Sequence, residues 1–198
     1  VFWLPVYQLP EAGSNARGRP IINWIPLEAG EKVQAVVPVR AYEEGRYVFF
    51  ATKNGTVKKT PLTEFAFKLA RGKIAINLDE GDALVGVALT DGERDIMMFA
   101  SNGRAVRFSE SLVRAMGRTA TRVRGMRLVE GADADVEGDQ EEGEAGDVDG
   151  APSIPEAGSE VVSLVVVDGE GDILSASERG YGTRTPVSGY PRTGRATR

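Results

Sequence analysis

Short apolar runs alternate with turn residues along the chain, and no long stretch repeats its apolar residues at the 3.6-residue period of a helix. Three segments share one pattern: an apolar run, a small-residue step, a turn that ends in glycine, and a second run that carries a base. They are residues 48–60, 96–108 and 173–185. Asn-Gly between two such runs is a strong hairpin signal, and the third segment has Arg-Gly in its place. The sequence therefore predicts three β-hairpins.

A second pattern lies between the hairpins. An Arg-Gly step leads through an acidic turn that contains glycine to a further apolar strand, as in Arg71-Gly72, the turn 78–82 and the run 84–87. The same order predicts strands at 33–37 and at 161–167. A unit of about 50 residues with four short strands is typical of a propeller blade.

We therefore expect one all-β, propeller-like domain over residues 1–198, built from four-stranded blades. The repeats are expected at about 1–46, 47–94, 95–171 and 172–198. The chain begins and stops inside a repeat, and a closed ring needs more units than these. We expect a fragment of a larger ring. Phe49, Phe50, Phe99 and Phe108 fall on strand positions, so we expect them in the core rather than in a base-stacking surface.

Charge changes this picture. The chain carries 24 bases and 29 acids, a formal charge of −5. Ten of the acids fall between residues 132 and 158, where there is no base, so the remainder has 19 acids against 24 bases and a charge of about +5. We expect residues 132–158 to be a disordered acidic insertion in one loop of a repeat. It is either a solvated loop without a role or a tethered polyanion that competes with DNA for the bases.

The bases recur at two places in each unit, directly after the hairpin turn and in the loop that leads to the Arg-Gly step. Repeats around an axis bring equivalent positions to one edge, so these bases predict a positive rim that binds the phosphates of duplex DNA. The predicted DNA-binding residues are Arg17, Arg19, Lys58, Lys59, Lys68, Arg71, Lys73, Arg107, Arg114, Arg118, Arg122, Arg124, Arg127, Arg184, Arg192, Arg195 and Arg198. Ordinary solvated surface charge is the alternative for each of them taken singly.

Several chemistries are excluded or disfavoured. The absence of Cys and His excludes disulfides, thiolate metal sites, cysteine nucleophiles and imidazole bases. No apolar run is long enough to span a bilayer, so we expect no membrane partner. A calcium site in the turn with Asp79, Glu80 and Asp82 is an alternative, but a similar turn recurs at Glu28 and Glu31, which favours a turn role. A protein-interaction propeller is the other rival, and it would bind with weak salt dependence.

Several segments resemble the C-terminal domain of the gyrase A protein of bacterial DNA gyrase. They are VYQLPE (6–11), ARGRPI (16–21), ATKNGTVKKT (51–60), VRAMGR (113–118), VRG (123–125) and GYGTRT (180–185). The resemblance covers nearly the whole chain outside 132–158. It implies a β-pinwheel of six blades that exchange strands and whose rim wraps duplex DNA. The family's Gln-Arg-Arg-Gly-Gly-Lys-Gly box is not in this chain. The corresponding C-terminal domain of topoisomerase IV, which binds DNA through a similar fold, is the nearest alternative.

The resemblance also implies a role within a larger enzyme. In that family the wrapped DNA is presented to the DNA gate of a type II topoisomerase, which introduces negative supercoils by ATP-dependent strand passage. The expected partners are the N-terminal part of gyrase A and gyrase B, in an A2B2 complex in the cytoplasm. ATP and Mg²⁺ are bound elsewhere in that enzyme, so we expect no cofactor, no metal and no catalytic residue in this domain.

Overall fold

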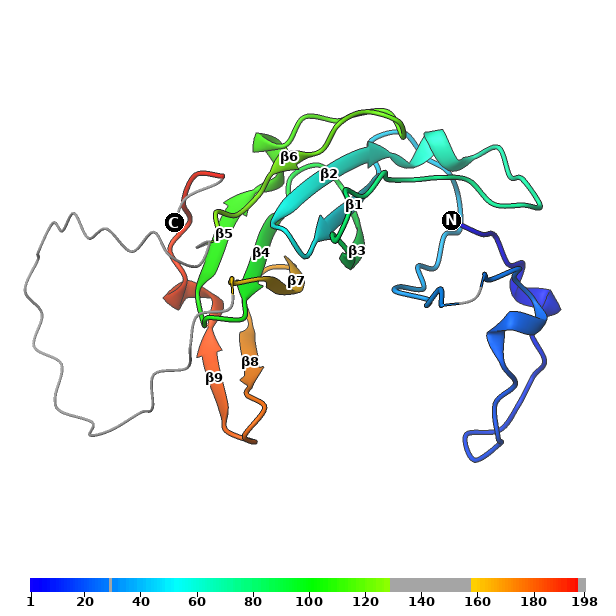
Figure 1. The fold of residues 1–198 in the computed structure, drawn as a ribbon, viewed down its shortest axis with the longest axis horizontal. Coiled ribbons are helices and arrows are strands. Elements are labelled where there is room, and N and C mark those ends of the chain that lie inside the picture. Colours follow the sequence, from blue (N-terminus) through cyan, green and yellow to red (C-terminus); the bar gives the residue numbers. More distant parts are fainter. Residues whose placement is uncertain (29, 129–157, 196–198) are drawn as a thin grey trace, which may run out of the picture.

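The computed structural model of the chain describes residues 1–28, 30–128 and 158–195. Within these ranges the chain forms nine strands and five short 3-10 turns, and it forms no α-helix. The strands make three sheets that follow one another along an arc, with the N-terminal segment at one end and the last hairpin at the other (Figure 1). The predicted all-β, propeller-like fold is confirmed.

The first sheet is built on the hairpin of β1 (Tyr47–Thr52) and β2 (Thr56–Pro61), with β3 (Leu84–Thr90) beside β1. Its fourth strand is β6 (Val123–Arg124), which pairs antiparallel with β2 although it comes after the second hairpin in sequence. The sheet order is β3-β1-β2-β6. One repeat's sheet is therefore completed by a strand from the next repeat, which is the strand exchange that the family resemblance implies.

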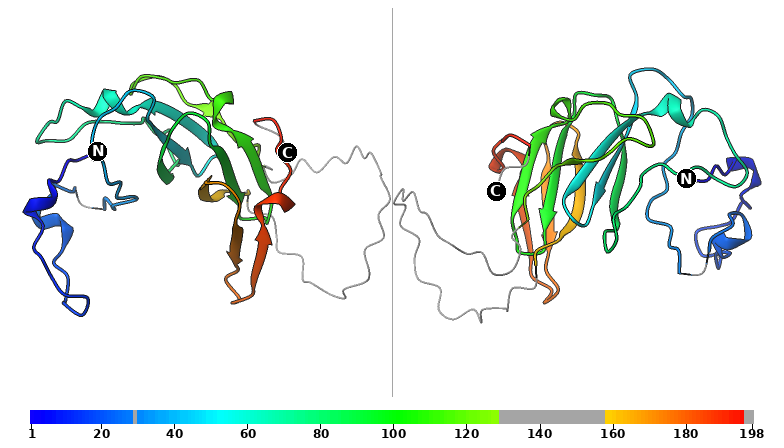
Figure 2. Two further views of the ribbon diagram at one scale, coloured as in Figure 1. Left: turned by 180° about the vertical axis from the view of Figure 1, so that it is seen from behind. Right: turned by 45° about the horizontal axis from the view of Figure 1, so that its top comes forward.

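The second and third sheets repeat parts of this plan. The second contains β4 (Asp95–Ala100), β5 (Ala105–Ser109) and β7 (Val161–Val167), in the order β5-β4-β7. The third is the hairpin of β8 (Asp172–Ala176) and β9 (Gly182–Pro186). In the further views this hairpin, orange to red, extends from the end of the arc that is opposite the blue N-terminal segment (Figure 2).

A 3-10 turn follows the second strand of every hairpin. These turns are η3 (Leu62–Phe65), η4 (Glu110–Leu112) and η5 (Val187–Gly189), and two more, η1 (Val6–Gln8) and η2 (Ile21–Asn23), lie in the N-terminal segment. The first amide of η3, η4 and η5 donates to the carbonyl of the residue before the hairpin's first strand, over 2.8 Å, 2.9 Å and 2.9 Å respectively. All three hairpins are therefore closed by the same backbone hydrogen bond.

The strand expected at 33–37 does not form. Across the described part of residues 1–46 the structure contains η1 and η2 but no strand. Val33 and Val36 are exposed, with 40% and 80% of their surface accessible. The equivalent strands β3 and β7 each pair with the first strand of a hairpin, and no hairpin lies beside 33–37. An unpaired strand would leave its backbone groups without partners, which explains why the apolar pattern alone gave a wrong prediction here.

The main core lies between the first and second sheets. Phe49 and Val57 from the first sheet pack with Ile96, Met98 and Phe108 from the second, and all five are fully buried. The opposite face of each sheet is covered as well, by separate clusters around Phe50 and Met97. Both faces of these strands are therefore buried, which accounts for their continuous rather than alternating apolar pattern. The expected core positions of Phe49, Phe50 and Phe108 are confirmed, and Phe99 is half-buried.

The residues that directly follow the exchanged strand β6 pack closely against the turn of the first hairpin. Gly55 has φ of +77°, and its carbonyl accepts hydrogen bonds from the amides of Gly125 and Met126. A methyl group on Gly55 would lie 2.6 Å from the carbonyl oxygen of Met126. Gly103 holds the same place in the second hairpin with φ of +83°, but it has open space around it.

This difference gives a matched pair of substitutions. Both Gly55→Ala and Gly103→Ala force alanine into a left-handed conformation, which costs about 1 kcal/mol. Only Gly55→Ala also displaces the exchanged strand, so we expect it to lower the free energy of unfolding by about 1–3 kcal/mol more. Urea denaturation followed by circular dichroism measures both losses, and equal losses would show that the exchanged strand does not rest on this turn.

Candidate nucleic-acid interface

The bases in the loops after the 3-10 turns are largely exposed. We call residues 66–75 the first basic loop and residues 113–128 the second basic loop. Both run along the convex edge of the arc (Figure 1). Of all the predicted DNA-binding residues, those classed as exposed are Arg17, Arg19, Lys68, Arg71, Arg114, Arg124, Arg127, Arg184 and Arg192. Five of the nine belong to the two basic loops, which makes this edge the strongest candidate for phosphate contacts.

Lys58 and Lys59 are not on that surface. The two side chains are 0% and 6% exposed, respectively, so the prediction that they contact DNA from an exposed rim is wrong. The Lys59 ammonium donates to the carbonyl of Glu110 at 2.9 Å and lies 5.0 Å from the centre of the Tyr47 ring. Burial lowers the pKa of Lys59, and the carboxylate of Glu110 opposes that effect. Burial also lowers the pKa of Lys58, with smaller contributions from Arg122 and Arg118.

The base that stands four positions after the turn glycine of each hairpin makes contacts within the fold. Lys59 in the first sheet contacts the carbonyl of the first residue of η4, and Arg107 in the second sheet contacts that of η5 (Val187) at 2.9 Å. Each cation therefore links its sheet to the 3-10 turn of the next repeat. Arg184 holds the same place in the third sheet, where its side chain is 77% exposed and pairs with Asp172.

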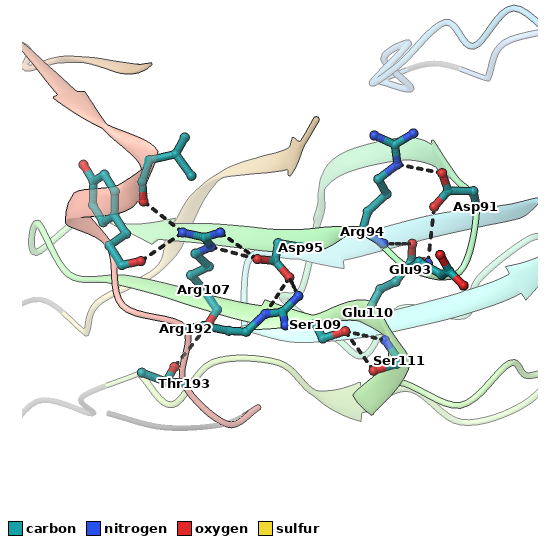
Figure 3. A network of polar contacts seen from close by, with 12 residues as sticks. Asp91, Glu93, Arg94, Asp95, Arg107, Ser109, Glu110, Ser111, Arg192 and Thr193 are labelled. Carbon is teal, nitrogen blue, oxygen red and sulfur yellow. Dashed lines mark hydrogen bonds and ion pairs between the residues drawn. The ribbon is translucent and has the colours of Figure 1, made fainter. Parts of the chain in front are cut away.

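Asp95 joins the second and third sheets. It pairs with Arg107, at 2.8 Å and 2.9 Å, and with Arg192 from the segment after η5 (Figure 3). Arg107 also donates to the carbonyl of Tyr190 at 3.2 Å, and its side chain is only 21% exposed, so its contacts lie mainly within the fold and its contact with DNA stays a prediction. Burial alone would raise the pKa of Asp95, but hydrogen bonds and charge from Arg192 and Arg107 outweigh it and hold that pKa below its ordinary value.

Glu110 is a second buried acid that the sequence did not single out. Its carboxylate accepts from the Thr90 hydroxyl at 2.6 Å and from the amides of Gly92 and Arg94 at 2.9 Å and 2.8 Å. It is fully buried and fixes the turn between the first and second sheets, part of which appears in Figure 3. Leu62 and Val187 occupy the same place in η3 and η5, so the repeat pattern predicts an apolar residue there rather than a buried acid.

For Asp95 the sequence did hold a signal. Asp95 precedes Arg107 by 12 positions, and Asp172 precedes Arg184 by the same interval. Antiparallel pairing of the two strands of each hairpin brings these residues together. Tyr47 stands 12 positions before Lys59, where it supplies a ring instead of a carboxylate. An acid or aromatic residue at this interval before the recurring base therefore indicates that the base has a partner within its own hairpin, whether the pair is covered, as at Arg107, or exposed, as at Arg184.

Three further arginines link loops from different repeats. Arg118 donates to the carbonyl of Ile74 at 3.0 Å, Arg195 donates to that of Arg124 at 2.6 Å, and Arg122 pairs with Asp79. The Arg118 and Arg122 side chains are 28% and 9% exposed. Little of the Arg122 side chain is accessible, Arg118 and Arg195 are half-buried, and DNA contact by these three arginines stays a prediction.

The remaining predicted bases are partly covered, or they lie outside the two basic loops or outside the described residues. Lys73 is half-buried, with its ammonium 5.8 Å from the Trp3 ring and 5.2 Å from the Phe67 ring. Arg17 and Arg19 belong to the N-terminal segment, at the end of the arc, rather than to the two basic loops. Arg198 and residues 132–157 of the acidic segment lie outside the described residues, so the expectations for them stay predictions.

The acidic turn considered for calcium has other partners. An oxygen of Asp82 accepts from the amides of Asn54 and Ala83 at 3.0 Å and 2.9 Å, and Asp79 pairs with Arg122. Among the residues that the structure describes, no three acidic side chains come together as a metal site would require. The same residues contain no helix that is long and apolar enough to cross a membrane.

Comparison with known proteins identifies the family to which this fold belongs. A family model described as "DNA gyrase C-terminal domain, beta-propeller" matches residues 1–40, 46–91, 94–134 and 171–198. The chain belongs to this family. Its relatives include the gyrase A protein of Salmonella typhimurium, which is 49% identical over 197 residues, and that of Klebsiella oxytoca, which is 50% identical over 197 residues. Both alignments cover all of this chain and 19% of the relative, so the chain spans about a fifth of these gyrase A proteins.

Solved structures agree with the gyrase-type fold. A structure described as the C-terminal domain of DNA topoisomerase IV matches all of this chain and 53% of its own, with a TM-score of 0.77 and 28% identity. A gyrase A C-terminal domain matches 91% of this chain and 51% of its own, with a TM-score of 0.67 and 19% identity. The second likeness shows the fold alone.

Proposed function

We propose that this gyrase-family chain binds duplex DNA along the convex edge formed by its two basic loops and bends the duplex around that edge. The observation that carries the proposal is the exposure of five bases on loops that follow equivalent 3-10 turns in adjacent repeats. Phosphates of one duplex recur along its axis, so bases on adjacent repeats can contact successive turns of the backbone. Such contacts carry little sequence information, and we expect little sequence preference.

In the whole protein we propose that bent DNA is delivered to a type II topoisomerase of the gyrase class. The partners would be the N-terminal part of gyrase A and gyrase B, with ATP and Mg²⁺ bound outside this domain and negative supercoiling as the result. The proposal assigns no catalytic residue and no cofactor to this chain. The resemblance to the topoisomerase IV domain favours a second candidate, in which the same edge binds DNA as part of a topoisomerase IV.

The first test is the binding of this chain to a duplex of about 40 base pairs, labelled at both ends, over a series of salt concentrations. Each phosphate contact contributes about −0.9 to the slope of log affinity against log salt, so we expect a slope of about −5 and ends that draw together. Steep binding without bending would limit the proposal to DNA binding. Weak binding that salt does not change would favour a protein partner and contradict the proposal.

A set of substitutions tests which surface the DNA uses. Removing the exposed bases Arg114, Arg124 and Arg127 together by alanine substitution should reduce the salt slope by about 3, because each removes one phosphate contact. Arg46 is the control, since it is exposed beside Leu89 of β3 and Val166 of β7 at the inner side of the arc. We expect Arg46→Ala to leave the slope unchanged. If Arg46→Ala reduced the salt slope as much as the removal of one base of the second basic loop, the DNA would bind on another face.

A further inference from the structure

Lys58 lies where the two basic loops meet. Its ammonium donates to the carbonyl of Ala75 in the first basic loop, at 3.3 Å, and to the carbonyl of Arg118 in the second. The side chain extends from the middle of β2 and is completely buried. One buried cation therefore holds a backbone oxygen from each of two loops that belong to different repeats.

Two arginines of the second basic loop reinforce the same junction. The guanidinium of Arg118 donates to the carbonyl of Ile74 at 3.0 Å, so Lys58 and Arg118 cross-link adjacent residues of the first loop. Arg122 adds an ion pair with Asp79, just beyond the end of that loop. Both arginine contacts cross from one repeat to the next.

Part of this arrangement recurs at the next junction. Arg118 and Arg195 each stand eight positions after the first residue of a 3-10 turn, Glu110 or Val187. Each donates to a carbonyl of the preceding repeat's loop, Ile74 or Arg124. These two acceptors are equivalent in position. Ile74 follows Lys73, which is hydrogen-bonded to Val1, and Arg124 follows Val123, which pairs with Val57. Val1 and Val57 each stand five positions before the first residue of a 3-10 turn that proline precedes.

The charge of Lys58 is not a requirement of the hairpin itself. The residues three positions after the turn glycine in the other two hairpins are Val106 and Thr183, which carry no charge. A buried ammonium loses its hydration, and an apolar residue of similar volume is often as stable or more stable at such a site. The cation at 58 therefore calls for a role beyond filling space, and its ammonium donates hydrogen bonds to both basic loops.

We propose that Lys58 and Arg118 are positioning residues that brace the first basic loop against the second, so that their exposed bases meet one DNA duplex as a single rigid surface. The inference rests on the proposed DNA-binding function. With the brace intact, Lys68 and Arg71 are held at a fixed separation from Arg114 and Arg124. Without it, each loop still carries its bases, but the two loops no longer contact phosphates at the same time without an ordering cost.

Lys58→Met tests the brace, with Lys59→Met as the matched control. Both remove a buried ammonium from neighbouring positions of β2, but Lys59 contacts the carbonyl of Glu110, which lies before the second basic loop. In the end-labelled duplex assay we expect Lys58→Met to weaken binding at low salt about tenfold and to reduce the salt slope by about 2, as the contacts of one loop are lost. Lys59→Met should change binding less than twofold.

A double-substitution cycle separates positioning from general damage. Arg71→Ala should cost less affinity in the Lys58→Met background than in the unchanged chain, because the first loop is already disengaged. In the Lys59→Met background the effect of Arg71→Ala should remain in full. Unaltered binding by Lys58→Met, or equal losses from Lys58→Met and Lys59→Met, would overturn the brace. Failure of the unchanged chain to bind DNA would overturn the proposed function instead.

Amide hydrogen exchange tests the brace without DNA. The amides of Met116 and Ala120 in the second basic loop are hydrogen-bonded to the carbonyls of Lys59 and Gly117. We expect Lys58→Met to raise the exchange rates of the Met116 and Ala120 amides at least about tenfold, relative to strands β4 and β5 of the same chain. Unchanged exchange of both amides would overturn the brace even if Lys58→Met weakened DNA binding.

Discussion

Replacing Glu110 with leucine is expected to lower the free energy of unfolding by about 4 kcal/mol. The substitution leaves the Thr90 hydroxyl and the amides of Gly92 and Arg94 without the acceptor that now holds them. It also removes the carboxylate that opposes the lowering of the Lys59 pKa, so the buried Lys59 ammonium becomes harder to keep charged. Urea denaturation of the chain and the variant measures the loss.

Glu110→Gln separates the two contributions. One amide oxygen can still accept from Gly92 and Arg94, and the amide nitrogen can donate to the hydroxyl of Thr90, so only the charge is lost. We expect a loss of about 1–2 kcal/mol, smaller than that of leucine. Leucine at this place is compatible with the repeat, since Leu62 holds it in η3. A loss below about 1 kcal/mol for Glu110→Leu would show that the turn after β3 does not depend on this acid.

Asp95→Asn is expected to destabilise the chain by about 2–3 kcal/mol near neutral pH. Asp95 is 8% exposed and holds two arginines, of which Arg107 is largely covered and Arg192 is 57% exposed. The covered Arg107 contact should account for most of the loss, because solvent weakens the contact with Arg192. The matched control is Asp172→Asn, which removes the equivalent pair with the exposed Arg184 and should cost less than about 1 kcal/mol.

The effect of Asp95 has a defined pH dependence. The folded-state pKa of Asp95 is lowered, so its contribution is fully present above the unfolded value of about 4 and is lost as the pH falls through the folded value. The difference in stability between the chain and Asp95→Asn should therefore be constant above pH of about 5 and shrink below pH of about 4. A difference that stays constant to the lowest pH at which the chain folds would contradict this assignment.

Local patterns in the sequence were sufficient for the hairpins. Asn54-Gly55 and Asn102-Gly103 both form the predicted turns, with glycine in the left-handed region, because the residues that specify a turn lie within it. The apolar run at 161–167 also forms its strand, since β4 is present to pair with it. The equally apolar run at 33–37 does not, because strand formation depends on a partner that the local pattern does not reveal.

The candidate site was harder to predict, because it depends on what covers each base. Lys58, Lys59 and Arg107 lie on strands whose two faces are both covered, so an alternating pattern does not distinguish exposed from buried side chains there. Bases in the loops after the 3-10 turns have fewer neighbours, and Arg71, Arg114 and Arg124 remain exposed as predicted. The partners of the two lysines also come from other elements of the chain. Only the fold brings Ala75 to Lys58 and Glu110 to Lys59.

The exchanged strand β6 also has a consequence during protein synthesis. Thr56 pairs with Arg124, so the first sheet lacks its outer strand until 68 more residues have been added to the nascent chain. At roughly 5–20 residues per second, that interval is about 3–14 seconds. For this time β2 has an open edge on or near the ribosome, which another nascent strand can pair with. A messenger that slows translation between the first and second hairpins should therefore increase aggregation of this chain, whereas a pause after residue 128 should not.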